Sequence, residues 1–576
     1  MTNARSILVL ALLMLGYLLW TQWQQDYARP HPSGTETTTA TPVTTSGSAS
    51  ATPAAAPGDT PTAPKVDTPA AVSAPTDSGA AGKSITVRTD VLEVAIDTRG
   101  GSLVRADLLA YPQQPKDFEH PVRLLDDSAA HFFVAQSGLV SAQGAAPDHQ
   151  ATFTAERDSY ALVEGKDQIE VPLTWIDAAS GLTVRKVYVF KRGSYVIDTR
   201  DEIGNAGSTA WTGNAYRQLQ RVPPVIPSGG GFAFNNPERF SFVGAAWYSP
   251  TDKFQKIKFD KYTTDKLCAS SDHDLARCTW ADGWAAMIQH YFFAAWIPPA
   301  GEKEAYQYAT TSANGQTRYL IRTLGPTLSV APGASTTSNA RLYVGPKLQS
   351  TLDQIAPGLA LTADYGIFTF IAEPLHWVLA KLYALTGNWG LAIILLVLLI
   401  KAVFFKLSEA QYRSMAKMKK LQPRVEALKE RYGDDRQKLN QAMLELYQKE
   451  KINPLGGCLP VLIPLPVFFA LYWVLLESVE LRHAPFIGWI QNLTAPDPYF
   501  VLPVLNGLAM IATQWLNPTT GMDPVQAKMM KAMPLMFAVM FAFFPAGLVL
   551  YWTVNGYASL IQQWIITRRI EAGAKA

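Results

Sequence analysis

Five apolar segments in the last third of the chain constrain its fold more than any other sequence feature. They lie at residues 388–407, 458–478, 499–516, 531–545 and 547–566, and all but the fourth approach the ~20 apolar residues that a membrane-spanning helix needs. The fourth is short, because the 14 residues from Lys531 to Phe544 give only ~21 Å of helix against a hydrocarbon core of ~30 Å. We therefore predict a polytopic α-helical membrane protein with a five-helix core.

The first 84 residues predict an anchor and a tether. Arg5 precedes an apolar run from Ile7 to Trp20, and the residues that follow lack the small side chains of a cleavage site. Residues 1–27 are therefore predicted to form an uncleaved transmembrane anchor, with a cleaved signal peptide as the alternative. Residues 28–84 contain no aromatic residue and no Leu, Ile or Met, so we expect a disordered tether rich in Thr, Ala and Pro.

Residues 85–345 carry the short alternating patterns of β-strands. The run ITVRTDVLEVAID (85–97) predicts one half-buried strand. The runs LTVRKVYVF (182–190) and YVIDTRDEI (195–203) flank a Gly-containing turn and predict a hairpin. About 260 residues of this kind indicate one large β-sandwich outside the cytoplasm.

The cysteine and histidine pattern predicts no metal site and no cofactor. There is no CxxC or HExxH motif, and the eight histidines are scattered. In an oxidising compartment Cys268 and Cys278 could pair as a disulfide, and two buried free thiols remain an equal alternative. The net charge of +3 and the lack of a basic face argue against direct binding of nucleic acid.

The distribution of basic residues orients the helices. Residues 408–453 carry eleven Lys and Arg, whereas residues 479–498 carry only Arg482. By the positive-inside rule, the first loop and the basic tail at 567–576 are cytoplasmic, and the β-sandwich is periplasmic. Both chain termini are then cytoplasmic. Residues 359–387 mix apolar and polar positions and break at Pro374, which predicts a periplasmic interfacial helix.

The basic loop at residues 408–453 has a helical pattern of its own. Apolar residues recur at spacings of three and four, which predicts an antiparallel helical hairpin; they are Met418, Leu421, Val425, Leu428 and Tyr432, then Leu439, Met443 and Leu446. Gly433 can end the first helix, and Asp434 or Asp435 can cap the second. Pro423 should kink the first helix or lie near its start. A solvated charged loop is the alternative.

Lys401 is the one charge well inside a predicted span, since Lys406 and Lys531 lie at span ends and Glu477 only marks the outer end of the second span. The five spans contain no Asp, no His and no Ser/His/Asp arrangement, which argues against an enzyme and against a proton-coupled transporter. One interpretation is that Lys401 extends to the cytoplasmic face. The other is that it projects into a water-holding cavity, where it would attract acidic segments.

Two polar stripes favour the second interpretation. They lie on single faces of two predicted spans and consist of Asn506, Thr513 and the adjacent Gln514, and of Trp552, Asn555, Ser559 and Gln562. In a bundle without catalytic groups they indicate a wet groove. Hydrogen bonding that merely holds the helices together is an equal alternative.

Three ordered motifs resemble a known family. AQYRSMAKMKKLQP, NPLGGCLPVLIPLPVFFALYWVLLESVEL and FPAGLVLYWTVN are similar to the YidC, mitochondrial Oxa and chloroplast Alb insertases. The resemblance covers residues 361–566 as an insertase core. The anchor, the tether and the large β-domain resemble the Gram-negative layout of that family.

The resemblance implies a hydrophilic groove that is open to cytoplasm and lipid. The groove charge of the family is usually Arg, and Lys401 at the matching position keeps the charge without the bidentate fork. Client helices are expected to slide along the second and fourth core spans, at Pro466, Phe468, Tyr472, Met533, Met536, Phe537 and Met540. The hairpin and tail resemble the parts that meet ribosomes, targeting factors and the Sec translocon.

The expected function is that of a membrane protein insertase and chaperone of the inner membrane, and not that of an enzyme. Its partners would be nascent membrane proteins, the Sec translocon, ribosomes, targeting factors and the phospholipid bilayer. A translocon-associated scaffold without insertion activity is the alternative. A sugar-processing sandwich would need a His/Glu pair in a cleft, which the sequence does not place.

Overall fold

The computed structural model describes Thr60 and residues 82–142, 144–224, 241–262, 278–313, 315–432, 435–449, 464–516 and 524–573. The predicted anchor, nearly all of the predicted tether, and Cys268 lie outside these ranges. Within them, no single helix combines the length and apolar character needed to cross a membrane.

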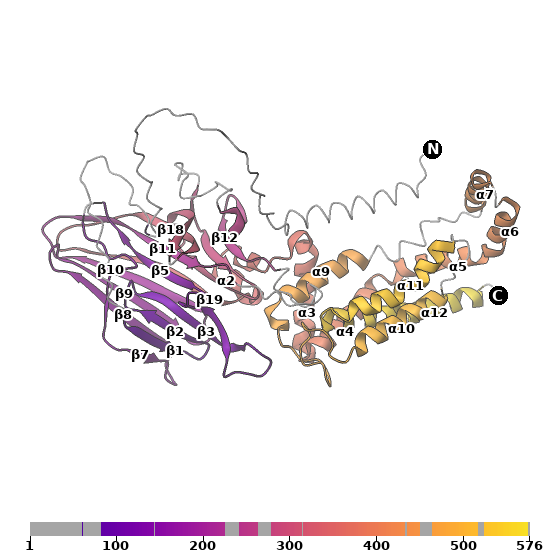
Figure 1. Cartoon of the computed structure of the whole chain (residues 1–576), viewed down its shortest axis with the longest axis horizontal. Helices are drawn as coiled ribbons and strands as arrows, with labels where there is room; N and C mark the ends of the chain where they lie inside the picture. The colour runs from indigo at the N-terminus through magenta and orange to yellow at the C-terminus, as the bar shows by residue number, and fades with distance from the viewer. Residues whose placement is uncertain are drawn as a thin grey trace, which may run out of the picture. The chain divides into compact units, whose positions relative to one another are not determined.

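Two antiparallel-rich sheets form the β-region, which Figure 1 shows in indigo to magenta. In the described ranges one sheet has the order β14-β17-β18-β11-β5-β3-β2-β1-β7, with β4 beside β3, and the other has the order β13-β12-β15-β16-β19-β10-β9-β8-β6. The bounds are β1 Ser84–Arg88, β2 Leu92–Asp97, β3 Ser102–Pro112, β4 Pro121–Leu125, β5 Phe133–Val140, β6 Thr154–Ala155, β7 Ser159–Ala161, β8 Gln168–Asp177, β9 Leu182–Lys191, β10 Val196–Asn205, β11 Trp211–Arg221, β12 Gly244–Ser249, β13 Lys253–Lys258, β14 Thr279–Ala281, β15 Trp284–Ile288, β16 Phe292–Ile297, β17 Lys303–Ala313, β18 Gln316–Val330 and β19 Ser335–Pro346.

The predicted hairpin is confirmed as β9 and β10, which pair antiparallel with Ile197 opposite Phe190. Gly193 in its turn has a φ of 65°, which glycine adopts without a steric penalty. The prediction of a single strand at 85–97 is wrong, because β1 and β2 form a second hairpin there. Thr89 makes the turn: its hydroxyl accepts hydrogen bonds from the backbone N–H groups of Val91 and Leu92.

Apolar side chains from both sheets fill the space between them. Val87, Ile96 and Leu103 come from one sheet and meet Phe190 and Ile197 of the other in one buried cluster. This alternation of inward and outward residues is what a two-sheet sandwich requires. The large β-domain predicted from the sequence is therefore confirmed.

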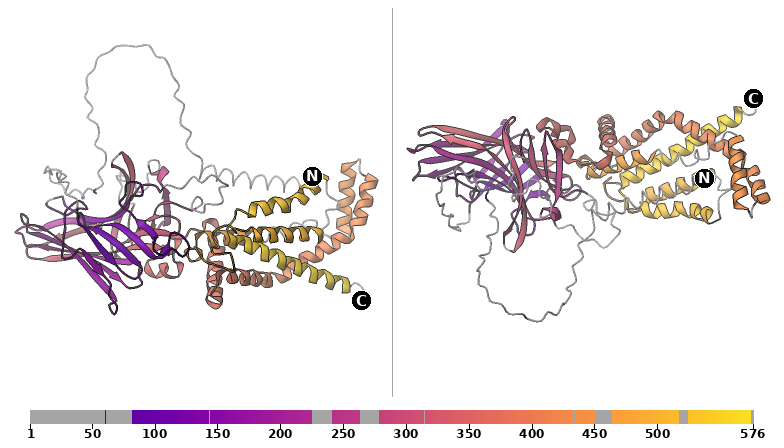
Figure 2. Two further views of the ribbon diagram at one scale, coloured as in Figure 1. Left: turned by 60° about the horizontal axis from the view of Figure 1, so that its bottom comes forward. Right: turned by 90° about the horizontal axis from the view of Figure 1, so that it is seen from above.

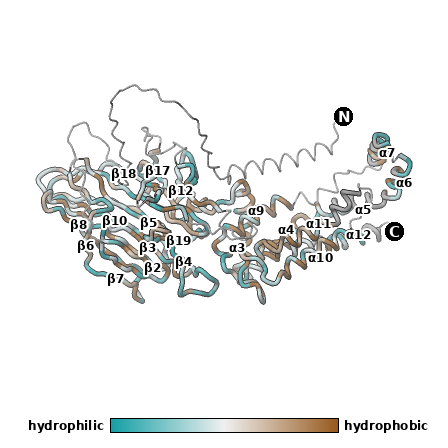
Figure 3. The backbone as a smooth tube through the Cα atoms, viewed as in Figure 1, coloured by the Kyte–Doolittle hydropathy of each residue, from teal (hydrophilic) through white to brown (hydrophobic). Residues whose placement is uncertain are grey.

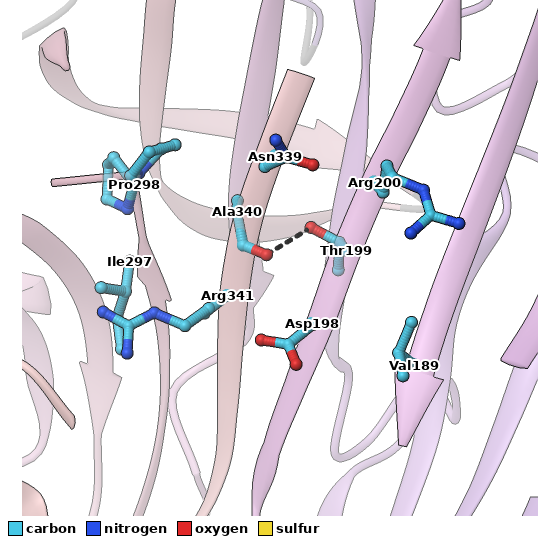
Figure 4. Close-up of a pocket in the computed structure, with 10 residues that line it drawn as sticks. Val189, Asp198, Thr199, Arg200, Ile297, Pro298, Asn339, Ala340 and Arg341 are labelled. Atoms are coloured by element: carbon cyan, nitrogen blue, oxygen red, sulfur yellow. Dashed lines mark hydrogen bonds between the residues drawn. The ribbon is translucent and has the colours of Figure 1, made fainter. Parts of the chain in front are cut away.

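The outer face of the nine-stranded sheet is partly covered by α2 (Gln349–Ile355) and the 3₁₀ helix η5 (Leu359–Thr362), which bury Trp284 and Tyr343. A pocket of about 330 Å³ lies on four strands of that sheet (Figure 4). Its lining is Val189, Asp198, Thr199, Arg200, Ile297, Pro298, Pro299, Asn339, Ala340 and Arg341. Asp198 is already paired with Lys191 at 2.7 Å.

The helical region follows η6 (Gly366–Phe368). Its helices in the described residues are α3 Thr369–Thr386, α4 Trp389–Val403, α5 Phe405–Lys420, α6 Gln422–Tyr432, α7 Arg436–Lys449, α9 Pro464–Glu477, α10 Val501–Leu516, α11 Pro524–Phe541 and α12 Ala546–Gly573, with the 3₁₀ helix η8 (Val479–Leu481) after α9. Figure 3 shows α4 and α10 largely in hydrophobic colours and α6 largely in hydrophilic ones.

Several helix limits differ from the predicted ones. The helix expected at 388–407 ends at Val403, and a second helix starts at Phe405. The short segment at 531–545 belongs to an 18-residue helix, because α11 begins at Pro524 and includes Lys528 and Lys531. The last helix extends beyond its predicted end at residue 566, into the predicted tail, and ends at Gly573. Pro374 does not break α3 but lies in its first half.

The basic loop forms α6 and α7, which lie side by side (Figure 2). Pro423 is the second residue of α6, where its missing N–H is tolerated. Asp435 caps α7 by accepting hydrogen bonds from the backbone N–H groups of Gln437 and Lys438, both at 3.1 Å. Gly433 and Asp434 lie outside the described residues.

Parallel packing of α10 and α12 is set by small and hydroxyl side chains. The Thr553 hydroxyl donates to the Leu502 carbonyl at 3.3 Å, and the Tyr557 hydroxyl donates to the Leu505 carbonyl at 3.2 Å. A Cβ atom at Gly556 would lie 3.2 Å from the Cβ atom of Ala509. The absence of a side chain at 556 therefore lets the two helices approach closely.

Candidate functional site

Lys401 lies on the packed face of α4. Val397 and Ile393, one and two turns before it, are buried, whereas Leu391 and Leu398, further round the helix, are 44% and 48% exposed. Residues four apart share one side of a helix. The Lys401 side chain is half-buried and continues the packed face, not the exposed one.

Ser559 on α12 receives the Lys401 ammonium. Lys401 Nζ donates to Ser559 Oγ at 2.7 Å, and that hydroxyl donates to the Asn555 carbonyl at 2.7 Å. Tyr412 on α5 donates its hydroxyl to the Ser559 carbonyl at 3.4 Å. No carboxylate lies within ion-pair distance of Lys401 in the described part of the chain, so its charge is solvated only by neutral dipoles.

The other predicted groove residues lie on α10 and α12. Asn506 is 2% exposed and Gln562 is 7% exposed. Thr513 donates its hydroxyl to the Ala509 carbonyl of its own helix at 2.8 Å. Gln514, Trp552 and Asn555 are half-buried. The structure thus links Lys401 to Ser559 and Ser559 to the backbone of Asn555, and it places the remaining side chains on α10 and α12.

Three of these buried polar groups have no hydrogen-bond partner among the described residues. They are Nδ2 of Asn506, Nε1 of Trp552, and both amide atoms of Gln562. A buried donor or acceptor without a partner costs about 1–3 kcal/mol. Such groups occur in native proteins where water or a bound molecule completes the bonding.

Aromatic rings from three helices meet at Trp552. Its ring centroid lies 4.9 Å from that of Phe468 on α9 and 5.8 Å from that of Phe541 on α11. Phe537 stacks on Phe541 at 6.0 Å. The structure therefore joins Phe468 and Phe537, predicted to contact clients, to Trp552, predicted to line the groove.

The methionines of the predicted client-facing side of α11 differ in their exposure. Met533 and Met536 are 37% and 62% exposed, whereas Met540 packs against the buried helical core. On α9, Pro466 is exposed and Tyr472 is half-buried. Met533 and Met536 are thus the more accessible to an apolar partner, and Met540 is half-buried.

Cys278 is buried and disulfide-bonded. Its predicted partner, Cys268, lies outside the described residues. In the described ranges no group of three or more His, Cys, Asp or Glu side chains could hold a metal ion.

Two functional contacts were missed in the sequence. Tyr412 lies on α5, after the break at Phe404 that separates it from Lys401 on α4, so the periodicity of one helix does not relate the two residues. Glu477 was interpreted only as the outer end of a span, but it forms a buried ion pair with Lys347. No local pattern relates residues 130 positions apart.

Comparison with known families matches the chain in two consecutive segments. The model of the YidC periplasmic domain matches residues 84–378, and that of the 60Kd inner membrane protein matches residues 381–573.

Curated relatives match over the full length. The membrane protein insertase YidC of Methylococcus capsulatus is 46% identical, over 99% of each chain. That of Alkalilimnicola ehrlichii is 48% identical, over 99% of this chain and 96% of its own. A crystal structure described as an active YidC insertase covers 84% of this chain and 94% of its own, with 17% identity and a TM-score of 0.35, and it adds no weight to the sequence matches. On those matches, the chain belongs to the YidC family of membrane protein insertases.

Proposed function

We propose that this chain inserts client membrane proteins into the inner membrane and helps them to fold, through a hydrophilic groove that Lys401 lines. The observation that carries the proposal is the hydrogen bond from Lys401 Nζ to Ser559 Oγ, on the packed face of α4 and without a carboxylate partner in the described residues. A charge held in this way remains free to attract an anion. The unpaired polar atoms of Asn506, Trp552 and Gln562 support water in the same groove.

The first step is capture of an acidic client tail. At short range a carboxylate and an ammonium attract each other more strongly in a half-buried site than in bulk water, because the effective dielectric is lower. Ser559 is a neutral partner that the client can replace. A lysine makes this attraction without the bidentate geometry of arginine, so the groove accepts tails of varied sequence.

The second step is release of the client's apolar segment into lipid. Phe468 and Tyr472 on α9, and Met533, Met536, Phe537 and Met540 on α11, would contact that segment, with Pro466 at the exposed start of the path. Thioether side chains adapt to different partners. Transfer of apolar surface from water contributes ~25 cal/mol per Å², so no nucleotide is required.

The membrane arrangement belongs to the same proposal. Six spans, the first near the N-terminus, place both termini and the α6–α7 hairpin in the cytoplasm and the sandwich in the periplasm. The hairpin and the basic C-terminal end would meet ribosomes, targeting factors and anionic lipid, and the Sec translocon would be a partner for larger clients. Cys278 would pair with Cys268, the nearest cysteine in the sequence.

A charge reversal tests the electrostatic step. We expect Lys401→Glu in proteoliposomes to reduce insertion of an acidic-tailed, single-span client by about tenfold, measured by protease protection, because the tail is repelled. Lys406→Glu is the matched control, since Lys406 is exposed five residues further along, and Lys401→Arg should retain activity. Undiminished insertion by Lys401→Glu would contradict the proposal.

A scaffold that only assists the translocon is the second candidate. It would bind clients but fail to insert them into liposomes that contain no other protein, so the same assay separates the two functions. A sugar-processing role gains no support from the pocket on the sandwich, because its ten lining residues include neither His nor Glu.

A further inference from the structure

The C-terminal end of α9 carries a buried ion pair that the insertion mechanism above does not use. Glu477, the last residue of α9, accepts a hydrogen bond from Lys347 Nζ on its Oε2 at 3.0 Å. The two side chains are 1% and 2% exposed. Lys347 directly follows β19, so the pair joins the last strand of the sandwich to a helix of the core.

Further contacts from the sandwich converge on the same helix end. Ser241, just before β12, donates its hydroxyl to Glu477 Oε1. His290, in the turn between β15 and β16, donates from Nε2 to the Leu476 carbonyl at 2.9 Å. Burial lowers the pKa of His290 to about 4, so the ring is neutral at neutral pH and adds no second cation to the pair.

The residues that follow Glu477 also contact the sandwich. Val479 is 1% exposed and belongs to the apolar core of the sandwich. Arg482 donates to the Pro112 carbonyl at the end of β3 at 2.7 Å. The segment from Leu476 to Arg482 thus contacts several sandwich segments that are far apart in the sequence.

A buried ion pair of this kind fixes geometry more than it adds stability. Removing two charges from water is costly, and their attraction offsets that cost only where the geometry is good and the remaining lone pairs are bonded. Both carboxylate oxygens of Glu477 have donors, from Lys347 and Ser241. Replacing such a pair by apolar residues of similar volume is often neutral or stabilising, so we infer that the role of this pair is to fix the geometry of the contact.

We propose that Lys347 and Glu477 are positioning residues that fix the depth and rotation of α9, so that its client-facing side chains meet the path into lipid. This inference rests on the proposed insertase function. Tyr472 and Phe468 lie five and nine residues before Glu477 on the same helix. A rotation of 100° at Glu477, one residue of helix, would turn Phe468 away from Trp552, whose ring it contacts at 4.9 Å between centroids.

Insertion per folded molecule tests the proposal. In proteoliposomes with matched amounts of folded full-length protein, Lys347→Met should reduce insertion of a single-span client at least fivefold. Photo-crosslinking from position 472 to the client should fall in parallel. Lys347→Arg keeps the cation and should restore both readouts. Lys303→Met, the same change at an exposed position of β17, is the control and should leave both unchanged.

A second readout does not depend on insertion. Spin labels at Gln168 in the sandwich and Ile487 after η8, both exposed, report whether the helix end is fixed. In a Cys458→Ser background, Lys347→Met should broaden the distance distribution about twofold. If the Lys347→Met protein does not fold, Glu477→Gln is the milder substitution. It should reduce insertion and broaden the distance distribution in the same way.

The outcomes are distinguishable. Unchanged insertion per folded molecule together with an unchanged distance distribution would overturn the positioning role and leave the pair as a structural contact only. If the wild-type protein itself failed to insert clients, the proposed function would fall, whereas the spin-label distances would still decide whether the pair fixes α9.

Discussion

Lys401 and Glu480 are both half-buried ionisable residues, but they differ in their hydrogen-bond partners. Lys401 has a neutral hydroxyl partner in Ser559, which leaves its charge available. Glu480, in η8 and beyond the predicted span, has an Oε2 atom without a hydrogen-bond partner in the described residues. A carboxylate in that environment is stabilised by taking up a proton, so its effect on stability depends on pH.

The raised pKa of Glu480 predicts that the folded protein loses stability as pH rises. Burial raises the pKa of Glu480 to about 7, above its usual value of 4.5. Between these values the folded protein holds a proton that the unfolded chain has released. The resulting stabilisation is fully present below about pH 4.5 and is lost as pH rises through about 7. Glu480→Gln, which stays neutral, should therefore exceed the wild type by less than ~1 kcal/mol at pH 5 and by ~3 kcal/mol at pH 8.

Thermal melts of the detergent-solubilised protein at the two pH values measure this difference. Glu164→Gln, at an exposed site of the sandwich, is the control and should show no pH-dependent difference from the wild type. A Glu480→Gln protein whose melting temperature relative to the wild type is the same at pH 5 and pH 8 would show that the carboxylate is solvated.

At the scale of elements, sequence periodicity located most of the helices and a few of the strands, but not all of their limits. The hairpin of β9 and β10 was predicted because its Gly-containing turn interrupts the alternation. The turn between β1 and β2 was missed, because Thr89 builds it with a side-chain hydroxyl and the alternation continues through it. The start of α11 was missed because hydropathy excludes lysines, whereas a helix accommodates Lys528 and Lys531 readily.

Close packing at the start of α4 gives a prediction for that helix. A Cβ atom at Gly390 would lie 2.0 Å from Cδ2 of Phe486. Gly390→Ala should therefore destabilise the protein by about 1–3 kcal/mol, although alanine favours the helix. Gly556→Ala, whose nearest contact is 3.2 Å, should cost less. Adding Phe486→Ala to Gly390→Ala should recover part of the loss of melting temperature, and a further decrease instead would exclude the steric explanation.

At the scale of the whole molecule, the long-range contacts are what the sequence could not provide. The two polar stripes and Lys401 were visible as patterns within single helices, and their placement on neighbouring helices follows from the bundle. The pairing of Lys347 with Glu477 joins a strand to a helix 130 residues later, across segments that no periodicity relates. Buried polar contacts of this kind depend on tertiary packing, whereas helix and strand propensity is local.

This long-range pair makes the effect of one substitution depend on how much of the chain is present. The core between the two sheets is built almost entirely from residues 82–348, with Val479 as the exception. We therefore expect a fragment of residues 82–363, which retains α2 and η5, to fold alone. In that fragment Lys347 has lost Glu477, so Lys347→Met should change its stability by less than ~0.5 kcal/mol.

In the full chain the same substitution leaves the Glu477 carboxylate buried without its cation, which should cost about 3–5 kcal/mol. Chemical denaturation of the fragment and of the full-length protein in detergent, each with and without Lys347→Met, measures both values. Equal losses in the two contexts would mean that Lys347 acts within the sandwich alone. A loss confined to the full chain assigns its role to the contact with α9, because only that contact differs between the two proteins.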